Sequence, residues 1–446
     1  MFLTNIKSIN YKLLAVLLLS AFIPTLYSTL RINYLGSLPE PWAFSIAAQV
    51  AWLNVAYEVI SEGLLLPLAF ILGQVIKDKN KFPQRMSMSL IIFASCYALM
   101  TLFVLLFTPK LLQLMQNTSD LVTATTHYIR LESIAIFISS IFTFCSLVFV
   151  LKNNQKALYQ LLILKTLLTI CFDTLFVSQT SVSLQLGVNG VAYTNIAVNS
   201  ILFVIAFIWL RKEGATFNVF KQENIAWLKQ WLRIGIKSGL ESFVRNAAFI
   251  VMILQLVNQV QQAGVFWVTN QFIWGWLLLP VLALGQLIKQ DAACSNGLSK
   301  HKVNSYMLLT LIFVTLWVLT IPLWSQFMSG VMGIDNYQPI YQLSLLMLGF
   351  YIVFAFNNVI DSYFYGIGRT DLMLYQSLIV NTVFYGAAFY AYQIDWFIPD
   401  LESIAIMFGL GITFDAIITF ALYRVIRRQE QTNSPDTFSG QVKAIC

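Results

Sequence analysis

Charged side chains inside long apolar stretches are the residues of this 446-residue sequence that could do chemistry. Asp173 stands alone in the segment TICFDTLF, without a basic residue within one helical turn. A buried carboxylate without a partner takes up a proton, or it is held ionised by a bound cation or by a basic group from another segment. Asp173 is therefore a candidate switch, whose proton or cation would change with access to either side.

Two further groups of charges have the spacing of one helix face. Glu58 and Glu62 are one turn apart, and in a confined aqueous cavity their repulsion would create a proton site. Lys237, Glu241 and Arg245 follow one another at intervals of four residues, so that one face could carry all of them. An alternative interpretation of this series is a self-neutralising row that only solubilises a cavity wall.

Five more charges lie within apolar stretches. Arg130 and Glu132 are expected near the end of a segment, where long side chains can simply extend to the membrane surface. Lys165, Asp361 and Asp415 are expected inside the fifth, tenth and twelfth apolar segments. A charge at membrane depth costs several kcal/mol, so such residues tend to face a cavity, to pair, or to serve transport.

The composition indicates which elements must position these charges. Hydrophobic residues make up 58% of the chain and charged residues 11%, against about 25% charged residues in soluble domains. The mean hydropathy is +0.73. Apolar runs long enough to cross a bilayer as helices lie at 12–34, 43–76, 86–108, 121–151, 156–178, 183–210, 231–260, 263–290, 303–328, 337–367, 371–393 and 402–426. The sequence therefore predicts an all-α polytopic membrane protein with twelve transmembrane helices.

An internal repeat predicts how these helices are grouped. GLLLPLAFILGQVIK at 63–77 returns as GWLLLPVLALGQLIK at 275–289, and LYQLLILKT at 158–166 returns as LYQSLIVNT at 374–382. Self-similarity at half the chain length indicates tandem copies of one unit. We expect two pseudo-symmetric six-helix lobes, with Gly73 and Gly285 allowing close helix packing in each. The predicted boundaries are a lobe at 1–210, a cytoplasmic linker at 211–230, a lobe at 231–428 and a disordered tail at 429–446.

The basic residues are confined to alternate connections. Lys77, Lys79, Lys81 and Arg85 follow the second apolar run, whereas the last opposite connection carries Asp395, Asp400 and Glu402. The positive-inside rule then places both termini in the cytoplasm of a multi-pass protein of the plasma (inner) membrane. The net charge of +7 is thus a topology signal, and it does not indicate nucleic-acid binding.

The motifs of enzymes are missing from the sequence. The five cysteines form no CxxC pair, and the two histidines have no companion at metal-ligand spacing. Neither a phosphate-binding GxxxxGK[ST] loop nor a nucleophile elbow is present. We therefore expect no enzyme activity, no metal and no cofactor.

Three segments resemble signatures of the multidrug and toxic compound extrusion (MATE) transporters. FIPTLYSTLRINYLGSL at 22–38 is similar to the first helix of that family, and FDTLFVSQTSVSLQLGVNGVAYTNIAVNSI at 172–201 to its fifth-to-sixth-helix signature. YGIGRTD at 365–371 is similar to the turn after helix ten. The resemblance implies a V-shaped pair of lobes around a central cavity that opens to alternate sides and exchanges a substrate for sodium ions or protons.

The resemblance also assigns a cation site to the first lobe. It places Asp173 at the acid of helix five, Thr169 one turn before that acid, and Thr194 at the end of the helix-six motif. Arg31 stands where the first helix of the family normally has Asp. An arginine facing Asp173 would replace the cation by a fixed charge pair, which favours proton coupling or an altered substrate over sodium coupling.

The second lobe departs from the family pattern as well. Arg245 aligns with an acid found in helix seven of some branches, and Phe354 aligns with the acid of helix ten. Two acids, Glu241 and Asp361, are nearby but on shifted positions. The residues expected to line the substrate cavity are Glu58, Glu62, Glu241, Arg245 and Asp361.

Two functional classes fit these residues. The first is an ion-coupled secondary antiporter, a monomer in the lipid bilayer, that exports amphipathic organic small molecules in exchange for a proton or sodium ion. The second is a flippase for a lipid-linked anionic saccharide, whose headgroup would suit the cationic set Arg31, Arg130, Lys165, Lys237 and Arg245. A membrane scaffold would not explain buried carboxylates in a duplicated frame. A positive cavity would favour the flippase, and a neutral or acidic one the antiporter.

Overall fold

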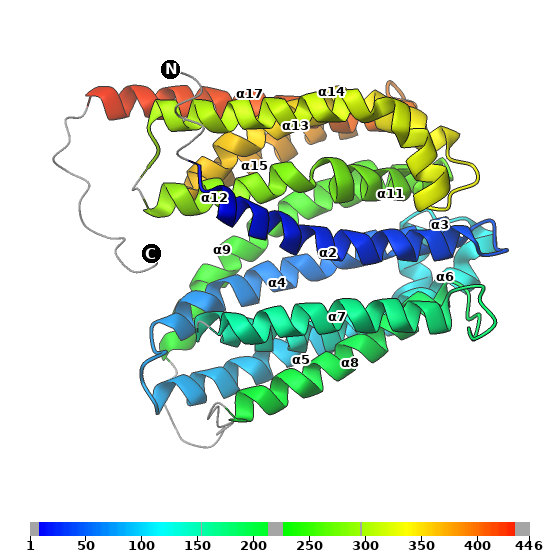
Figure 1. Cartoon of the computed structure of the whole chain (residues 1–446), viewed down its shortest axis with the longest axis horizontal. Helices are drawn as coiled ribbons and strands as arrows, with labels where there is room; N and C mark the ends of the chain where they lie inside the picture. The colour runs from blue at the N-terminus through cyan, green and yellow to red at the C-terminus, as the bar shows by residue number, and fades with distance from the viewer. Residues whose placement is uncertain (1–8, 153, 213–225, 295–296, 433–446) are drawn as a thin grey trace. The chain divides into compact units, whose positions relative to one another are not determined.

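The protein is nearly all helical. A computed structural model describes residues 9–152, 154–212, 226–294 and 297–432, and within these ranges no strand occurs (Figure 1). Eleven helical segments of the described residues are each long and apolar enough to cross a membrane, and a bent helix pair brings the number to twelve. Helices satisfy their backbone hydrogen bonds within one segment, as lipid requires. The expected all-α membrane fold with twelve spans is confirmed.

The first seven spans are close to their predicted positions. They are α2 (Tyr11–Gly36), α3 (Ala43–Ala48) with α4 (Val50–Gly73), α5 (Lys81–Leu114), α6 (Val122–Leu151), α7 (Gln155–Phe176), α8 (Asn189–Lys212), and α9 (Ala226–Phe249), which continues through a π-turn (Ile250–Leu254) into α10 (Gln255–Gln259). The sixth span was expected from residue 183, but α8 begins at Asn189. The preceding residues instead fold back on the end of α7, where the N–H groups of Leu184 and Leu186 donate to carbonyls of Leu175 and Phe176.

The remaining spans contain more irregular helix. They are α11 (Ala263–Phe272) with a π-turn (Ile273–Leu277) followed by α12 (Leu279–Cys294), α13 (Lys300–Gln326) with a π-turn (Phe327–Val331), α14 (Gln338–Gly366), α15 (Thr370–Ile379) with a π-turn (Val380–Phe384) and α16 (Tyr385–Gln393), and α17 (Leu401–Thr432). The chain bends by 54° between Leu277 and Leu279. Pro280 lacks the N–H that would continue the backbone ladder there.

The start and end of α17 show how local chemistry sets helix limits. The backbone N–H of Ser403 donates to Asp400 Oδ1 at 2.7 Å, and this hydrogen bond lowers the pKa of the Asp400 carboxyl. At the other end α17 continues to Thr432, past the lobe end expected at 428. The rest of the expected tail, 433–446, lies outside the described residues, as does 213–225 of the expected linker.

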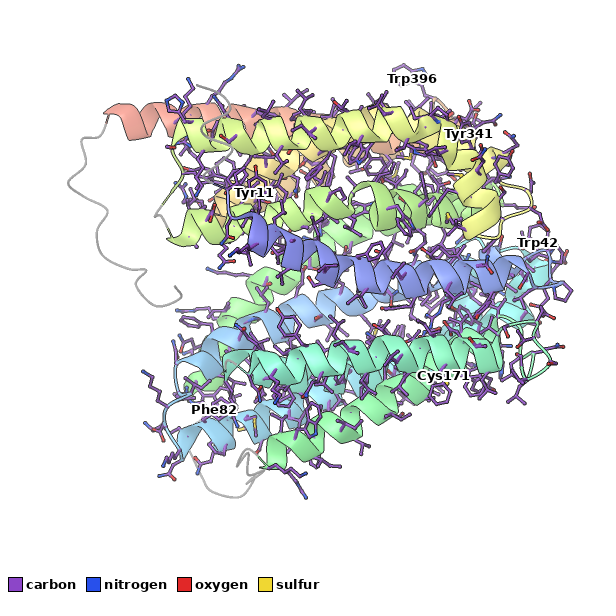
Figure 2. All side chains as sticks on the ribbon, in the orientation of Figure 1. Tyr11, Trp42, Phe82, Cys171, Tyr341 and Trp396 are labelled. Carbon is purple, nitrogen blue, oxygen red and sulfur yellow. The ribbon has the colours of Figure 1, made fainter. Side chains whose placement is uncertain are left out.

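Side chains that point outward from the helices are largely apolar (Figure 2). Leu66, Leu99 and Leu319 are each about two-thirds exposed (65%, 67% and 68%), although they lie in the middle of long helices. Trp42 and Trp396, which lie between helices, are also exposed. An apolar exterior with aromatic residues at its ends is what contact with lipid and its interfaces requires.

Contacts divide the chain into two compact units. The first unit is Thr29–Gly264, and the second unit combines Met1–Ser28 with Val265–Cys446. This grouping differs from the predicted lobes at two places, because the start of α2 falls in the second unit and α9 falls in the first. The predicted lobe boundaries therefore stay a prediction.

Helix α9 falls in the first unit because it packs very closely on α4. A Cβ atom on Gly235 would overlap the carbonyl oxygen of Gly63, and one on Gly239 would lie 3.3 Å from the Gly63 Cα. The Trp231 indole N–H donates to the Leu64 carbonyl at 2.9 Å. We call the contact of Gly63 with Gly235 and Gly239 the glycine seam, because backbones approach directly there.

The two copies of the internal repeat pack differently against their neighbouring helices. A Cβ atom on Gly285 would lie 2.7 Å from Ser362 Oγ and 2.8 Å from Asn358 Nδ2, so α12 and α14 pack closely there. A Cβ atom on Gly73 would meet only Leu151 Cδ2, at 3.8 Å. Close packing is confirmed at Gly285, whereas for Gly73 the expectation is wrong because the neighbouring helix leaves ordinary van der Waals space.

Candidate functional site

The first candidate site is an ion pair inside the first unit. Arg31 on α2 donates from Nε to Asp173 Oδ2 at 2.8 Å and from Nη2 to Asp173 Oδ1 at 3.2 Å. The Asp173 side chain on α7 is 1% exposed and that of Arg31 is 17% exposed. A bidentate pair of this kind is strong and fixes the orientation of both groups. The guanidinium thus balances the charge of the buried Asp173 carboxylate.

The ion pair continues into a buried polar network across two more helices. Arg31 Nη2 also donates to Asn195 Oδ1 on α8 at 3.1 Å. The Asn195 amide nitrogen in turn donates to both carboxylate oxygens of Glu132 on α6, at 2.9 and 3.1 Å. Glu132 is 3% exposed, so it does not extend to the membrane surface as its sequence position suggested. The network therefore holds two carboxyl groups and one guanidinium.

The two threonines expected beside Asp173 are buried but do not bond to it among the described contacts. Thr169 lies one turn before Asp173 on α7, and its hydroxyl donates to the Lys165 carbonyl at 2.8 Å. Thr194 on α8 is fully buried, and its hydroxyl has no hydrogen-bond partner. Of the four residues predicted for the cation site, the structure thus brings Arg31 and Asp173 into contact.

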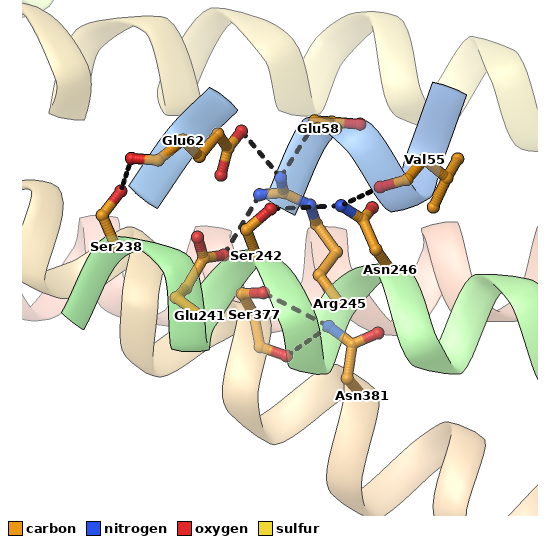
Figure 3. A network of polar contacts seen from close by, with 10 residues as sticks. All are labelled: Val55, Glu58, Glu62, Ser238, Glu241, Ser242, Arg245, Asn246, Ser377 and Asn381. Atoms are coloured by element: carbon orange, nitrogen blue, oxygen red, sulfur yellow. Dashed lines mark hydrogen bonds and ion pairs between the residues drawn. The ribbon is translucent and has the colours of Figure 1, made fainter. Parts of the chain in front are cut away.

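A second charged cluster joins α4 and α9 beside the glycine seam. Arg245 Nη2 lies 2.9 Å from Glu62 Oε1 and 3.2 Å from Glu58 Oε1, and Nη1 lies 3.1 Å from Glu241 Oε1. Figure 3 shows the two glutamates of α4 and the glutamate of α9 converging on one guanidinium. Four of the five residues predicted to line the substrate cavity thus meet at Arg245.

The Arg245 cluster carries more acid than base. Its side chains are partly exposed, from 18% for Glu241 to 44% for Glu58. Water therefore screens each ion pair and lowers its contribution to stability. Within the described part of the chain no ion pair joins Lys237 to Glu241, so the predicted three-residue row is confirmed only for Glu241 and Arg245. Three carboxylates around one guanidinium leave capacity to attract a further cation.

A third polar cluster lies in the second unit, where α14, α15 and α17 pack together. Asp361, the fifth predicted cavity residue, accepts from Thr419 Oγ1 at 3.2 Å and from Asn357 Nδ2 at 3.0 Å. The same Asn357 nitrogen donates to Asp415 Oδ2 at 2.9 Å, and Gln376 Nε2 donates to Asp415 Oδ1 at 2.6 Å. We call these five residues the aspartate pair cluster. Among described residues, no three His, Cys, Asp or Glu side chains are arranged to hold a metal ion.

Sequence reasoning missed the neutral members of the Arg31 network and of the aspartate pair cluster. Asn195, Asn357 and Gln376 are amides within apolar spans, and each one links or supports carboxyl groups. An amide at membrane depth is costly unless it is hydrogen-bonded, so its occurrence in such a span was an available signal. The search for charges alone did not use it.

Comparison with known proteins identifies the fold. No family model matches the sequence, and the search of curated proteins found no match. Solved structures do match over nearly the full length. An inward-facing multidrug resistance MATE family transporter of the MOP superfamily has a TM-score of 0.77 at 17% identity, covering 92% of this chain and 96% of the other.

Two further structures give the same result. An outward-facing MATE family transporter of the MOP superfamily has a TM-score of 0.64 at 16% identity, over 96% of this chain and 98% of the other. A MOP superfamily transporter from Pyrococcus furiosus has a TM-score of 0.65 at 17% identity, over 96% and 98%. The chain is an integral membrane protein with paired charges buried between its helices. Its fold is that of the MATE transporters, as the sequence motifs predicted.

Proposed function

We propose that the protein is a secondary active transporter that works by alternating access and exports amphipathic organic compounds in exchange for protons or sodium ions. The observation that carries this proposal is the fold likeness, which spans nearly the whole chain and includes transporters solved in inward-facing and outward-facing states. Charges held inside the helix bundle add support, because a membrane protein without a polar pathway has little use for them. We further propose that it acts as a monomer in the plasma (inner) membrane.

In this proposal Asp173 is the switch of the first unit and Arg31 is its partner. A guanidinium at 2.8 Å leaves little reason for a sodium ion to bind the same carboxylate, because two cations would then share one negative charge. The pair therefore disfavours sodium at Asp173, which leaves proton coupling at another site or an altered substrate.

The test is efflux in everted membrane vesicles with an imposed pH or sodium gradient and a planar fluorescent organic cation as substrate. We expect a gradient to drive uptake by the wild type and Asp173→Asn to abolish it. Asp371→Asn is the matched control, because Asp371 is an exposed aspartate paired with Arg369 outside these networks. Gradient-driven uptake that survives Asp173→Asn would remove Asp173 from the mechanism.

Arg31→Asp in the same vesicles tests the role of the guanidinium. If Arg31 takes the place of a coupling cation, its replacement by an acid should alter the ion dependence of uptake. Unchanged dependence on both gradients would show that Arg31 is not in the coupling site.

The flippase remains the second candidate function. The Pyrococcus furiosus transporter is described as having a binding pocket of reverse polarity that suggests a different function, so this fold can accept other charge patterns. In the present chain Arg31 and Arg245 are each already paired with carboxylates, which favours organic cations over lipid phosphates. Transbilayer movement of a fluorescent polyprenyl phosphate in proteoliposomes, without uptake of the organic cation, would favour the flippase instead.

A further inference from the structure

The second unit contains a pocket between the bent helix pair α11–α12 and helix α13, with a volume of about 350 Å³. The bent pair contributes Phe272 and Trp276 before its 54° bend and Pro280 after it. The facing wall is a stripe of α13 side chains at helical spacing, which runs from Phe313 to Trp324. The pocket therefore lies at the bend of this span.

Contacts between aromatic rings hold the walls of the pocket in place. Phe272 packs edge-on against Trp324, with ring centroids 5.2 Å apart, and Trp276 packs in the same way against Phe327 at 4.9 Å. The indole N–H of Trp324 donates to Thr320 Oγ1 at 3.2 Å. These contacts fix the rings, so the space does not close by rotation of one side chain. An empty space of this size costs stability, because the atoms that line it lose dispersion contacts.

The chemistry of the lining makes water a poor occupant. Thr320 carries the one hydroxyl among the described lining residues. That hydroxyl donates to the carbonyls of Leu316 and Trp317, both at 2.9 Å, and it accepts from Trp324. The other lining residues are aromatic side chains, leucines and a proline. A buried water needs several polar partners, so an apolar occupant fits this pocket better.

The position of the opening indicates where an apolar occupant comes from. Leu316 and Leu323 line the pocket and are 51% and 57% exposed, and they flank Leu319 on the outward face of α13. Trp317 and Trp324 line the same pocket but are only 4% and 3% exposed. The pocket thus leads from the apolar exterior of α13, which contacts lipid in a membrane protein, to two buried tryptophans.

We propose that this pocket binds one hydrocarbon chain of a membrane phospholipid, and that the chain supports the bend between α11 and α12. The bend needs such support because Pro280 has no N–H to continue the backbone ladder. An organic cation is a poorer occupant, because none of the described lining residues carries a charge that could balance it. Binding of the chain does not depend on the proposed function.

The test is photo-crosslinking of the purified full-length protein in phosphatidylcholine nanodiscs. A small fraction of the phosphatidylcholine carries a diazirine near the end of one acyl chain, and mass spectrometry of peptides locates the adducts that form on irradiation. We expect adducts on Trp317 and Trp324, which are too buried to meet lipid at the outer surface. Adducts confined to exposed side chains such as Leu99 and Leu319 would overturn the proposal.

Variants at the opening show whether the chain enters the pocket. Leu316→Trp and Leu323→Trp each place a larger side chain there, so the adducts on the two buried tryptophans should be lost. Leu319→Trp is the matched control, because Leu319 lies on the same exposed face of α13 and does not line the pocket. That control should keep the wild-type pattern. Adducts on Trp317 and Trp324 that persist in both opening variants would contradict entry by this route and overturn the proposal.

A planar organic cation that carries the same diazirine is the second probe. Labelling of Trp317 and Trp324 by this cation and not by the lipid would assign the pocket to an exported compound and overturn the proposal. Labelling by the lipid alone would support it. Lipid labelling in a protein without gradient-driven uptake would support this site and reject only the proposed function.

Discussion

Arg31 is a single residue that determines the charge balance of a buried site. It contacts the carboxylate of Asp173 through two nitrogens and supports Asn195, which in turn holds Glu132. Removing one member of a buried pair costs more than removing both, because the remaining charge keeps the cost of its burial without compensation. Replacing Arg31 alone should therefore destabilise the protein more than replacing Arg31 and Asp173 together.

At this scale we predict that Arg31→Gln lowers the free energy of unfolding by about 3 kcal/mol, since Asp173 is then buried without a cation. Adding Asp173→Asn to that variant should restore much of the loss. The measurement is a double-mutant cycle on urea unfolding of the purified protein in detergent. A double variant as unstable as Arg31→Gln would show that the two side chains are not energetically coupled.

The sequence predicted the contact of Arg31 with Asp173, because an arginine at the place of a family acid has to find a negative partner. It did not predict Glu132 and Asn195 as members of the same network. Pairing across helices depends on the rotation of each helix about its axis, and spacing within one helix does not fix that rotation. The glutamates around Arg245 show the same limit, since Lys237 has the spacing to join them and does not.

Among the helices, the contact of α4 with α9 depends on glycines. At the glycine seam the backbone of α9 approaches Gly63 so closely that a Cβ atom on Gly235 has no space. The obstacle is a backbone carbonyl, which cannot rotate away as a flexible side chain could. Close approach of this kind replaces side-chain packing as the source of helix association in lipid.

We predict that Gly235→Ala destabilises the protein by about 1–3 kcal/mol, because the added methyl group must push two backbones apart. Gly349→Ala is the matched control, since it is also a glycine within a helix and a Cβ atom there meets nothing within 4 Å. That control should be neutral or slightly stabilising. The measurement is the thermal unfolding midpoint of each variant. Equal midpoints would show that the glycine seam does not depend on the lack of a side chain at Gly235.

Helix positions were the most predictable feature of the chain, because the length of an apolar run is set by the bilayer and is readable without any partner. The π-turns at Ile250–Leu254, Ile273–Leu277, Phe327–Val331 and Val380–Phe384 were not predicted. Their sequences are ordinary apolar stretches, and a π-turn depends on the packing around it.

For the whole molecule, the distribution of charge predicts its orientation in the membrane. The connection between α4 and α5 is basic, with an exposed Lys79, whereas the connection between α16 and α17 carries Asp395 and a Trp396 that is 84% exposed. Basic connections remain on the cytoplasmic side. The two connections are therefore expected on opposite faces.

We predict that Lys79→Cys, in a variant whose native cysteines are replaced by alanine, reacts with a membrane-impermeant maleimide only in everted vesicles. Trp396→Cys should react only in right-side-out vesicles, because its connection faces the other compartment. Gel-shift labelling in both preparations is the measurement. Labelling of both positions from one side would refute the proposed orientation.

Helix α2 has residues in both units, because the boundary between them falls inside it, after Ser28. Its earlier part contacts the second unit through the apolar core around Leu14 and through a neutral hydrogen bond, from Thr25 Oγ1 to the Gly275 carbonyl at 3.2 Å. Its later part is held in the first unit by the charged Arg31 pair. A neutral hydrogen bond contributes about 1 kcal/mol and a buried charged one several times that when broken. Within α2, substitution of Thr25 should therefore cost less stability than substitution of Arg31.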